Sequence, residues 1–249
     1  MIENVIETTE YCRHCLMCRH VDPVGHVSHN ETLTPHGWGQ LVASERRGMV
    51  SWNEDTVERM YAFADNGNSR AHCVTSQPLP EAIAAVRAEV VDAGEARDVV
   101  YDLQERLREW ENPYEQREPE AVEGSGETAL FVGDAARYLR PGVLDAAQAL
   151  LADLGIEAVS VARGRNSGFL ASSLGLREVA TDIAEANLAD LEAVGADRVI
   201  VLSPEAKFAF SQMYEERLGI EPPADVEVVK LSELLARSEE RREGKECIV

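Results

Sequence analysis

Residues 128–161 read TALFVGDAARYLRPGVLDAAQALLADLGIEAVSV, in which one apolar run precedes a helical pattern and a second apolar run follows it. We expect a strand over 129–132, a helix over 141–154 that ends at Gly155, and a strand over 158–161. Glycine after a helix permits the left-handed turn that leads into the next strand. This strand–helix–strand order predicts a largely parallel sheet with helices packed on it.

The same alternation continues further along the chain. Helices are expected over 178–194 and 204–218, each followed by glycine, and strands over 198–202 and 226–231. Residues 128–236 are therefore predicted to form an α/β domain with a mostly parallel sheet.

Residues 1–110 lack this alternation and carry helical periodicities instead. Helices are expected over 39–47, 54–64 and 98–110, and another opens at Pro80 with apolar side chains along one face. Residues 111–127 hold six Glu, two Pro and two Gly, which cannot bury a core, so we expect a solvated, mobile acidic linker. The predicted fold is an N-terminal all-helical domain, this linker and the C-terminal α/β domain.

Charge excludes several classes of function. The 249 residues include 45 Asp and Glu against 24 Lys and Arg, a formal charge of −21 with a pI near 4.6. Such a chain repels phosphate backbones and anionic lipid, so sequence-independent nucleic-acid or membrane-surface binding is not expected. Only three of the basic residues are Lys, a composition that suits a high-salt cytoplasm. The whole-chain charge predicts a partner with a basic docking patch.

The sequence also predicts where the chain resides. It holds no run of about 20 apolar residues that could span a bilayer, and residues 1–10 carry acids rather than a secretory signal. We therefore expect a cytoplasmic protein with reduced cysteines, used for metal or redox chemistry rather than for disulfides.

Four of the five cysteines and all six histidines lie in the N-terminal part of the chain, none of them beyond Cys73. Cys12, Cys15 and Cys18 have the spacing C-x2-C-x2-C, which lets three thiolates converge on one compact inorganic centre. Zinc is an alternative, with His14, His20 or His72 as the fourth ligand. Two further alternatives are that Cys73 is a small buried apolar residue and that the site is empty.

The segments YCRHCLMCRHVDPVGH (11–26) and ETLTPHGWGQL (31–41) resemble the helical two-cluster ferredoxin domain of the heterodisulfide-reductase-like family. That family includes iron–sulfur subunits of glycerol-3-phosphate, glycolate and lactate oxidising systems. Its first motif ends in x3-C-P, and here Asp22 stands where that fourth cysteine would be, before Pro23. Its second motif falls on Phe63, Asn66 and Ser69, with only Cys73 kept.

In such domains the first three cysteines of one motif share a cluster with the fourth cysteine of the other. The resemblance therefore implies one complete ligand set for a single [4Fe–4S] cluster, made of Cys12, Cys15, Cys18 and Cys73. The second set, made of Phe63, Asn66, Ser69 and Asp22, holds no thiol. The resemblance thus implies that one cluster is kept and its neighbour is lost.

The resemblance extends over the α/β half, which in the family carries a Cys-Cys-Gly pattern. Its cysteines are absent here, while the framing Gly133, Gly168, Gly175 and Pro204 remain. We expect the side chains at the replaced positions to line a polar pocket at the carboxyl ends of the strands. These side chains are Asp134, Asn166, Ser167 and Ser203.

Two catalytic interpretations of this half are disfavoured. No His follows His72, which excludes a Ser-His-Asp triad within it, and residues 164–168 lack the lysine of a phosphate-binding loop. Residues 237–249, RSEERREGKECIV, are predicted to be a non-native or disordered tail, the alternative being an ordinary polar helix end. Cys247 is therefore given no role.

The resemblance implies a non-catalytic electron-transfer subunit of an oxidoreductase complex. Its partner would be a flavoprotein or another iron–sulfur redox subunit. The alternative, from a different class, is a zinc-stabilised scaffold that binds a partner without redox activity.

Overall fold

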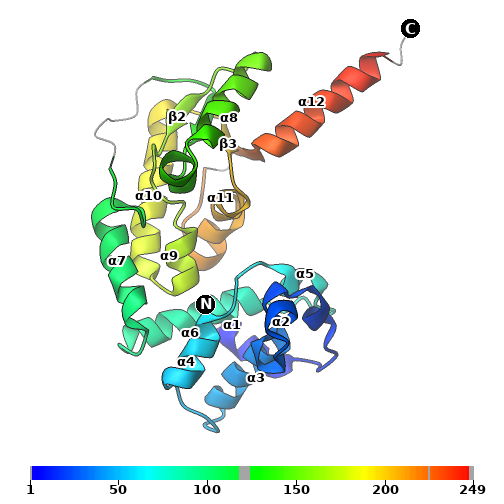
Figure 1. The fold of residues 1–249 in the computed structure, drawn as a ribbon, viewed down its shortest axis with the longest axis vertical. Coiled ribbons are helices and arrows are strands. Elements are labelled where there is room, and N and C mark those ends of the chain that lie inside the picture. Colours follow the sequence, from blue (N-terminus) through cyan, green and yellow to red (C-terminus); the bar gives the residue numbers. More distant parts are fainter. Residues whose placement is uncertain (1, 118–123, 224, 247–249) are drawn as a thin grey trace. The chain divides into compact units, whose positions relative to one another are not determined.

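The computed structural model describes residues 2–117, 124–223 and 225–246 (Figure 1). The chain forms two compact units, and each is discontinuous in sequence. We call Met1–Gln104 together with Ala171–Arg177 unit 1, and Glu105–Leu170 together with Glu178–Val249 unit 2.

Every regular element described before residue 111 is helical, as the sequence predicted. The α-helices are α1 (Ile2–Glu7), α2 (Pro23–Ser28), α3 (Pro35–Arg46), α4 (Glu54–Tyr61), α5 (Asn68–His72), α6 (Leu79–Asp92) and α7 (Asp98–Trp110). Short 3-10 turns connect them: η1 (Thr8–Tyr11), η2 (Met17–Val21) and η3 (Glu31–Leu33). Helix α7 begins in unit 1 and ends in unit 2.

Local sequence signals fix where these helices begin. The Thr34 side chain accepts a hydrogen bond from the amide of Gly37, and Pro35 occupies the first turn of α3. Asp22 accepts likewise from Gly25, ahead of Pro23 in α2. Such caps satisfy amides that a helix leaves without intrahelical partners, and proline costs nothing at the first turn.

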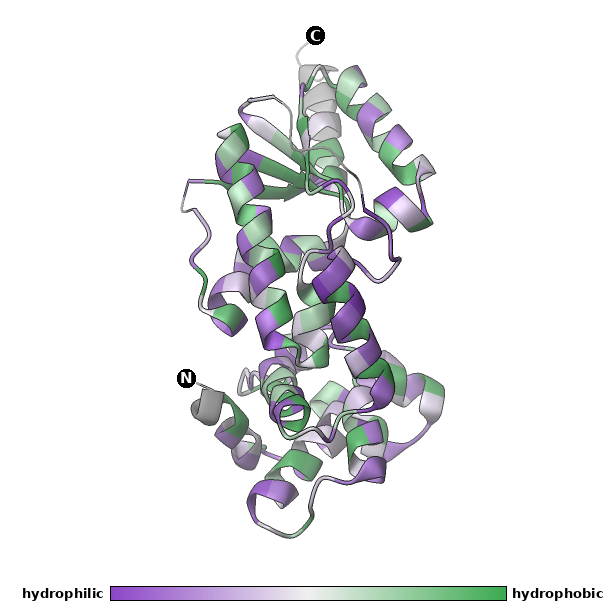
Figure 2. Ribbon diagram, turned by 90° about the vertical axis from the view of Figure 1, so that its left-hand side faces the viewer, coloured by the Kyte–Doolittle hydropathy of each residue, from purple (hydrophilic) through white to green (hydrophobic). Residues whose placement is uncertain are grey.

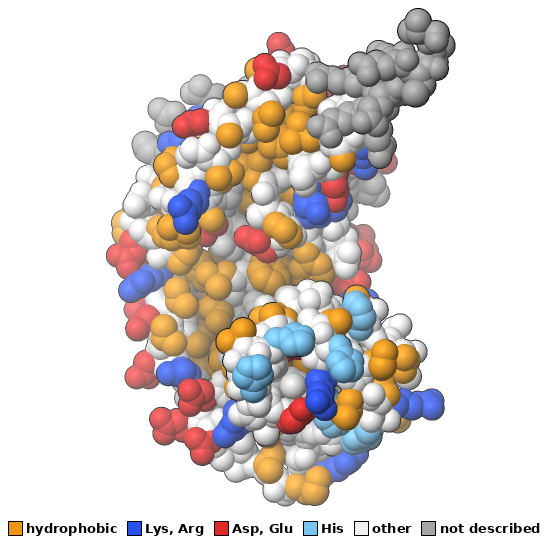
Figure 3. All heavy atoms as spheres, turned by 45° about the vertical axis from the view of Figure 1, so that its right-hand side comes forward, with side chains coloured by type: hydrophobic (Ala, Val, Ile, Leu, Met, Phe, Trp, Pro, Cys, Tyr) orange, Lys and Arg blue, Asp and Glu red, His pale blue; other side chains and the backbone are white. Residues whose placement is uncertain are grey.

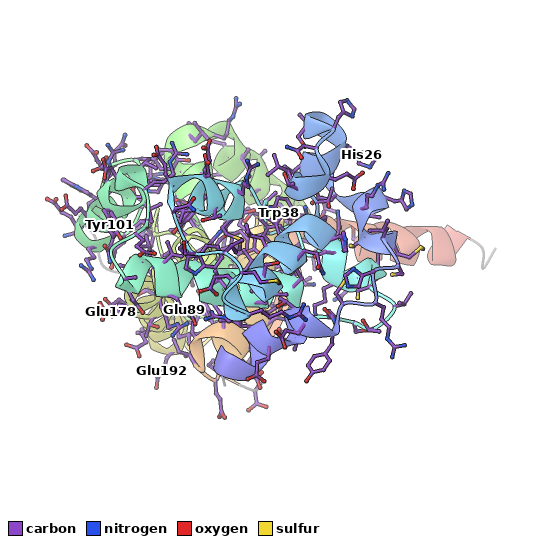
Figure 4. The ribbon with its side chains drawn as sticks, turned by 90° about the horizontal axis from the view of Figure 1, so that it is seen from below. His26, Trp38, Glu89, Tyr101, Glu178 and Glu192 are labelled. Carbon is purple, nitrogen blue, oxygen red and sulfur yellow. The ribbon has the colours of Figure 1, made fainter. Side chains whose placement is uncertain are left out.

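The core of unit 1 is built around Trp38 (Figure 4). This side chain is fully buried, donates its indole N–H to the carbonyl of Arg59 at 2.7 Å, and meets the ring of Phe63 edge to face. Apolar residues of α6, including Ile83 and Val86, complete the cluster.

A buried arginine ties residues 171–177 into unit 1. Arg87 of α6 is 3% exposed and donates to the carbonyl oxygens of Met60, Phe63 and Ser173. Gly175 adopts φ 87°, and a Cβ there would collide with the backbone of Arg87. Glycine is therefore required at this close approach.

Unit 2 is a parallel α/β sheet. Its strands are β1 (Thr128–Phe131), β2 (Val159–Val161), β3 (Arg198–Val201) and β4 (Glu227–Lys230), in the spatial order β2-β1-β3-β4. Its helices are α8 (Gly142–Asp153), α9 (Phe169–Leu174, from residue 171 part of unit 1), α10 (Arg177–Val194), α11 (Pro204–Phe208) and α12 (Leu231–Glu246). Two π-helical stretches, η4 (Ala135–Leu139) and η5 (Ala209–Leu218), complete it, and η5 continues directly from α11.

Side chains of the strands alternate between two apolar cores. Ala129, Phe131 and Val201 pack with residues of α10, α11 and η5, whereas Leu130 and Ile200 pack with residues of α8 and α12. Because both faces are covered, apolar residues predominate in the strands, and Figure 2 colours much of the sheet green. The four expected strands and the helices expected over 141–154 and 178–194 agree within one residue at each end with β1–β4, α8 and α10, whereas the helix expected over 204–218 is divided into α11 and the π-helical η5.

The predicted linker differs from the structure in its first part. Residues 111–117 pack within unit 2: Asn112 is 1% exposed, and its side chain bonds the carbonyls of Trp110 and Gln116 and the amide of Tyr114. The physical reason is that Asn112 satisfies backbone groups left unpaired where α7 ends. Residues 118–123 lie outside the described part of the chain.

The predicted tail boundary also differs, because α12 runs unbroken across residue 237. Arg237 forms an ion pair with Glu227 of β4 at 2.9 Å. Cys247 lies outside the described residues. Among the described helices, none is both long and apolar enough to cross a bilayer.

The first prediction concerns Arg87. We expect Arg87→Met to lower the free energy of unfolding by about 3 kcal/mol or more, because buried carbonyls lose their donor. Urea unfolding of the full chain measures this. Arg198→Met is the matched control: Arg198 pairs with exposed Glu227, and its loss should cost less than about 1 kcal/mol. Equal losses of unfolding free energy in the two variants would show that the buried hydrogen bonds of Arg87 stabilise the fold no more than an exposed ion pair does.

Candidate metal centre and the polar pocket of the α/β unit

Three of the predicted ligands lie on one tight loop of unit 1. Cys12 follows η1, Cys15 lies in the loop, and Cys18 belongs to η2. His14 and Leu16 adopt left-handed backbone conformations, with φ of 53° and 61°. These two turns fold the loop back on itself within a few residues.

The fourth predicted ligand is brought to this loop by packing between η2 and α5. Cys73 ends α5, and the Asn68 side chain of that helix donates to the carbonyl of Val21 in η2 at 3.1 Å. Cys18 is half-buried, and burial raises the pKa of its thiol, as do the nearby thiols of Cys12, Cys73 and Cys15. All four predicted cysteines therefore gather in one place.

Cys73 has the environment of a stabilised thiolate. Burial opposes its ionisation, but hydrogen bonds from the Thr75 hydroxyl and the amides of Thr75, Ser76 and Gln77 outweigh burial and lower the pKa of the thiol. Its sulfur lies 3.3 Å from the Thr75 Oγ1. Donors of this kind favour the anionic form that binds metal.

Histidines border the thiols. His36 Nδ1 lies 3.8 Å from Cys12 Sγ, and the rings of His36 and His14 meet edge to face at 5.3 Å. Burial lowers the pKa of His36, and the neighbouring His14 lowers it further. His36 is a neighbour of the thiols that spacing along the sequence did not single out. His20 and His72 are exposed.

The four thiols differ in exposure. All four are free of disulfides, and Cys15 is exposed. Among the described side chains, no group of three or more His, Cys, Asp or Glu converges closely enough to hold a metal ion. Binding at this centre therefore requires the cysteine side chains to reorient.

The four positions that the resemblance assigns to a second cluster have other roles in this structure. The ring of Phe63 fills the core beside Trp38, Asp22 caps α2, and Asn66 accepts from the amide of Asn68. The buried Oγ of Ser69 has no hydrogen-bond partner among the described residues. Apolar packing and helix capping account for three of these four positions.

A small polar pocket lies where the sequence predicted one in unit 2, but Asn166 is not among the residues that line it. The strand order reverses between β1 and β3, which is where parallel α/β sheets open a crevice at the carboxyl ends of the strands. Asp134, Ser167 and Ser203 line a cavity of about 30 Å³ there, with Glu205 at α11. That volume holds about one water molecule.

The polar groups in and around this pocket form hydrogen bonds with one another. Asn166 donates to the Asp134 carboxylate at 2.8 Å and accepts from the amide of Gly168, while Tyr214 donates to the carbonyl of Ser167. Burial raises the pKa of Asp134, and the Asn166 bond opposes that rise. The polar groups satisfy one another, so this site is suited to stabilising the fold rather than to binding a large ligand.

The sequence did not reveal the partners behind this pocket. Asn187 is 1% exposed and bonds both the carbonyl of Asn166 and the hydroxyl of Tyr214. Arg165 pairs with Asp190 at 2.8 Å and with Glu111 at 3.1 Å. A polar residue on an apolar helix face, as Asn187 is in α10, was the one available signal.

Comparison of the chain with known protein families, with characterised proteins and with solved structures finds no match.

The pocket yields the second prediction. Asn166→Asp places two carboxylates where an amide now donates to Asp134, so the folded-state pKa of the pair rises. A pKa raised by folding costs stability as pH increases through it. We expect a loss of about 2 kcal/mol at pH 7 that shrinks toward pH 4, measured by urea unfolding against the unsubstituted protein at each pH.

Asn66→Asp is the matched control, because Asn66 is exposed and only accepts a hydrogen bond. Its stability difference should not change with pH in this way. A pH-independent effect of Asn166→Asp would contradict the closed network described above.

Proposed function

We propose that this protein is an electron-transfer protein that carries one [4Fe–4S] cluster on Cys12, Cys15, Cys18 and Cys73. The observation that carries the proposal is the packing of η2 against α5, which gathers four thiols from two segments that lie far apart in sequence. Within the described residues no other place brings thiols together.

The donor set suits such a cluster. Thiolates are the ligands that iron–sulfur clusters take, and four of them complete one [4Fe–4S] site. When bound, the cluster would accept and release single electrons. The amides and hydroxyl around Cys73 would stabilise its thiolate, and N–H donors of this kind raise the potential of an anionic centre.

The exposures of the four cysteines differ in a way that supports electron exchange. Cys12, Cys18 and Cys73 are partly buried, which limits the access of water to their side of the site. Cys15 is exposed and would give the centre one edge toward a partner.

The remaining residues support a role as a relay rather than as an enzyme. The second ligand set has no thiol. In the pocket of unit 2, the polar side chains form hydrogen bonds with neighbouring protein groups. We propose that the chain is a subunit or accessory of a flavin-dependent oxidoreductase complex, of the type that the sequence resembles. Its partner would be a flavoprotein or another iron–sulfur subunit, and chemistry on the substrate would belong to that partner.

One observation favours a second candidate function. His36 Nδ1 lies close to Cys12 Sγ, and zinc accepts mixed shells of sulfur and nitrogen ligands. A zinc-stabilised scaffold that binds a partner would use the same loop without redox chemistry.

The third prediction separates these candidates. Protein isolated or reconstituted without oxygen should be brown and contain about four iron and four sulfide per chain, since one complete thiol set exists. Metal and sulfide analysis of one preparation measures this. Stoichiometric zinc without sulfide would establish the scaffold, and about eight iron would show that non-cysteine ligands hold a second cluster.

The fourth prediction concerns Cys73. Cys73→Ala should lose the iron and sulfide as completely as Cys15→Ala, because both remove a ligand of the same cluster. It should also lower the melting temperature of the loaded protein, since metal binding joins η2 to α5. Cys247→Ala is the matched control and should retain the full iron content. A stable, complete cluster in Cys73→Ala would exclude Cys73 as a ligand.

A further inference from the structure

The loop that leads into α5 reads Asp65-Asn66-Gly67-Asn68 and contains the one Asn-Gly pair of the 249 residues. Asn66, Gly67 and Asn68 are all exposed, so water reaches the peptide bond between Asn66 and Gly67. Glycine has no side chain to shield its amide nitrogen, and that nitrogen can therefore attack the side chain of the preceding asparagine. The sequence and the exposure together indicate a site of deamidation that needs no enzyme.

The backbone of this loop favours the reaction. Asn66 Oδ1 accepts a hydrogen bond from the amide of Asn68 at 2.9 Å. This turn holds the side-chain carbonyl of Asn66 beside the main chain of Gly67, and the hydrogen bond polarises the carbonyl carbon. Among the described residues the Gly67 amide donates no hydrogen bond, so no such bond holds its nitrogen away from that carbon.

We propose that Asn66 is a modification site: it converts spontaneously to isoaspartate, and this change weakens metal binding by the four cysteines. The modification depends on the loop alone. The inference rests on the proposed function only for the identity of the metal centre that the modification affects.

The reaction consumes water and releases ammonia. The Gly67 nitrogen loses its proton and forms a bond to Asn66 Cγ, and the bond from Cγ to Nδ2 breaks as ammonia leaves with a proton. Water then opens the resulting succinimide ring. Opening at Cγ gives aspartate, whereas opening at the main-chain carbonyl of residue 66 gives isoaspartate, in which the main chain runs through Cγ. Nothing is oxidised or reduced.

Isoaspartate adds one atom to the main chain directly before α5. The carbonyl that accepts from the Asn68 amide becomes part of the main chain, so this end of the helix is displaced. The side chain of Asn68 also donates to the carbonyl of Val21 at 3.1 Å, and Cys73 ends the same short helix. Displacement of α5 therefore moves Cys73 relative to Cys18 in η2. Metal sites tolerate changes of only about 0.2 Å in ligand distance, so binding weakens.

Ageing of the full chain tests the modification. Metal-free, reduced protein is incubated without oxygen at mildly alkaline pH, and mass spectrometry of its peptides locates the deamidated residues. Methyl transfer by an isoaspartate-specific methyltransferase detects isoaspartate. We expect isoaspartate at residue 66 first. Asn166 is the internal control, because it precedes the small Ser167 but is buried. Intact Asn66 in the aged chain, or equally fast reaction of Asn166, would overturn the proposal.

Co²⁺ binding tests the consequence for the metal centre. Co²⁺ bound to thiolates gives an intense charge-transfer absorbance, and this band is the readout because histidines exposed on unit 1 can bind Co²⁺ without the thiols (Figure 3). We expect the isoaspartyl fraction of the aged protein to bind Co²⁺ on thiolates at least about tenfold more weakly than fresh protein. Unchanged affinity at high isoaspartate content would contradict this.

Two comparisons separate the modification from general ageing. Asn66→Ser keeps an oxygen that can accept from the Asn68 amide but cannot form a succinimide, so this variant should keep its Co²⁺ affinity through the same incubation. The methyltransferase with S-adenosylmethionine converts isoaspartate to aspartate and should restore the affinity of the aged protein, because aspartate leaves the main chain at its normal length. Equal losses in Asn66→Ser and the unsubstituted protein, or no recovery after repair, would overturn the proposal.

Iron and sulfide analysis of fresh protein tests the cluster separately. Fresh protein that takes up no iron and sulfide would contradict the proposed function, while the Co²⁺ comparison would still measure how isoaspartate affects the four thiols. Failure of the proposed function and failure of this inference are therefore distinguishable.

Discussion

The packing of η2 against α5 is the constraint on which the candidate centre depends. It joins two chain segments that are far apart in sequence, and it includes a hydrogen bond from the Asn68 side chain to the carbonyl of Val21. Closing so long a loop costs conformational entropy that the helical core around Trp38 offsets. A metal centre bound across this contact would add its binding free energy to the stability of the folded state.

The two units differ in whether their clustered polar side chains are bonded to one another. In unit 1, four thiols lie near one another, but among the described side chains they do not converge closely enough to hold a metal ion. In unit 2, Asp134 and Asn166 bond each other, and Asn187 and Tyr214 complete the network behind them. The thiols of unit 1 are therefore available to bind a metal centre. The polar side chains of the unit 2 pocket already form hydrogen bonds with one another. This contrast is why we assign ligand binding to unit 1 and a stabilising role to the pocket of unit 2.

Periodic apolar patterns predicted the strands of unit 2 and its longer helices, because burial of a strand or helix face is a local property of sequence. The gathering of Cys73 with Cys18 came from a resemblance and not from the local pattern, since nothing near Cys73 shows which loop it meets. Arg87 could not be predicted as a core residue, because its partners are backbone carbonyls of distant segments. The sequence likewise did not predict that residues 171–177 belong to unit 1, since Gly175 is indistinguishable from a glycine in an ordinary turn.

Because residues 171–177 belong to unit 1, no continuous part of the gene encodes one unit alone. The chain supplies unit 1 with residues up to Gln104, builds part of unit 2, returns the segment Ala171–Arg177 to unit 1, and then completes unit 2. A fragment ending near Trp110 would lack Ser173, which accepts from Arg87, and Gly175, which lies against its backbone. A coding sequence for either unit alone therefore cannot be a single continuous stretch. Fusion, fission or exchange of one unit during evolution would have to carry part of the other with it.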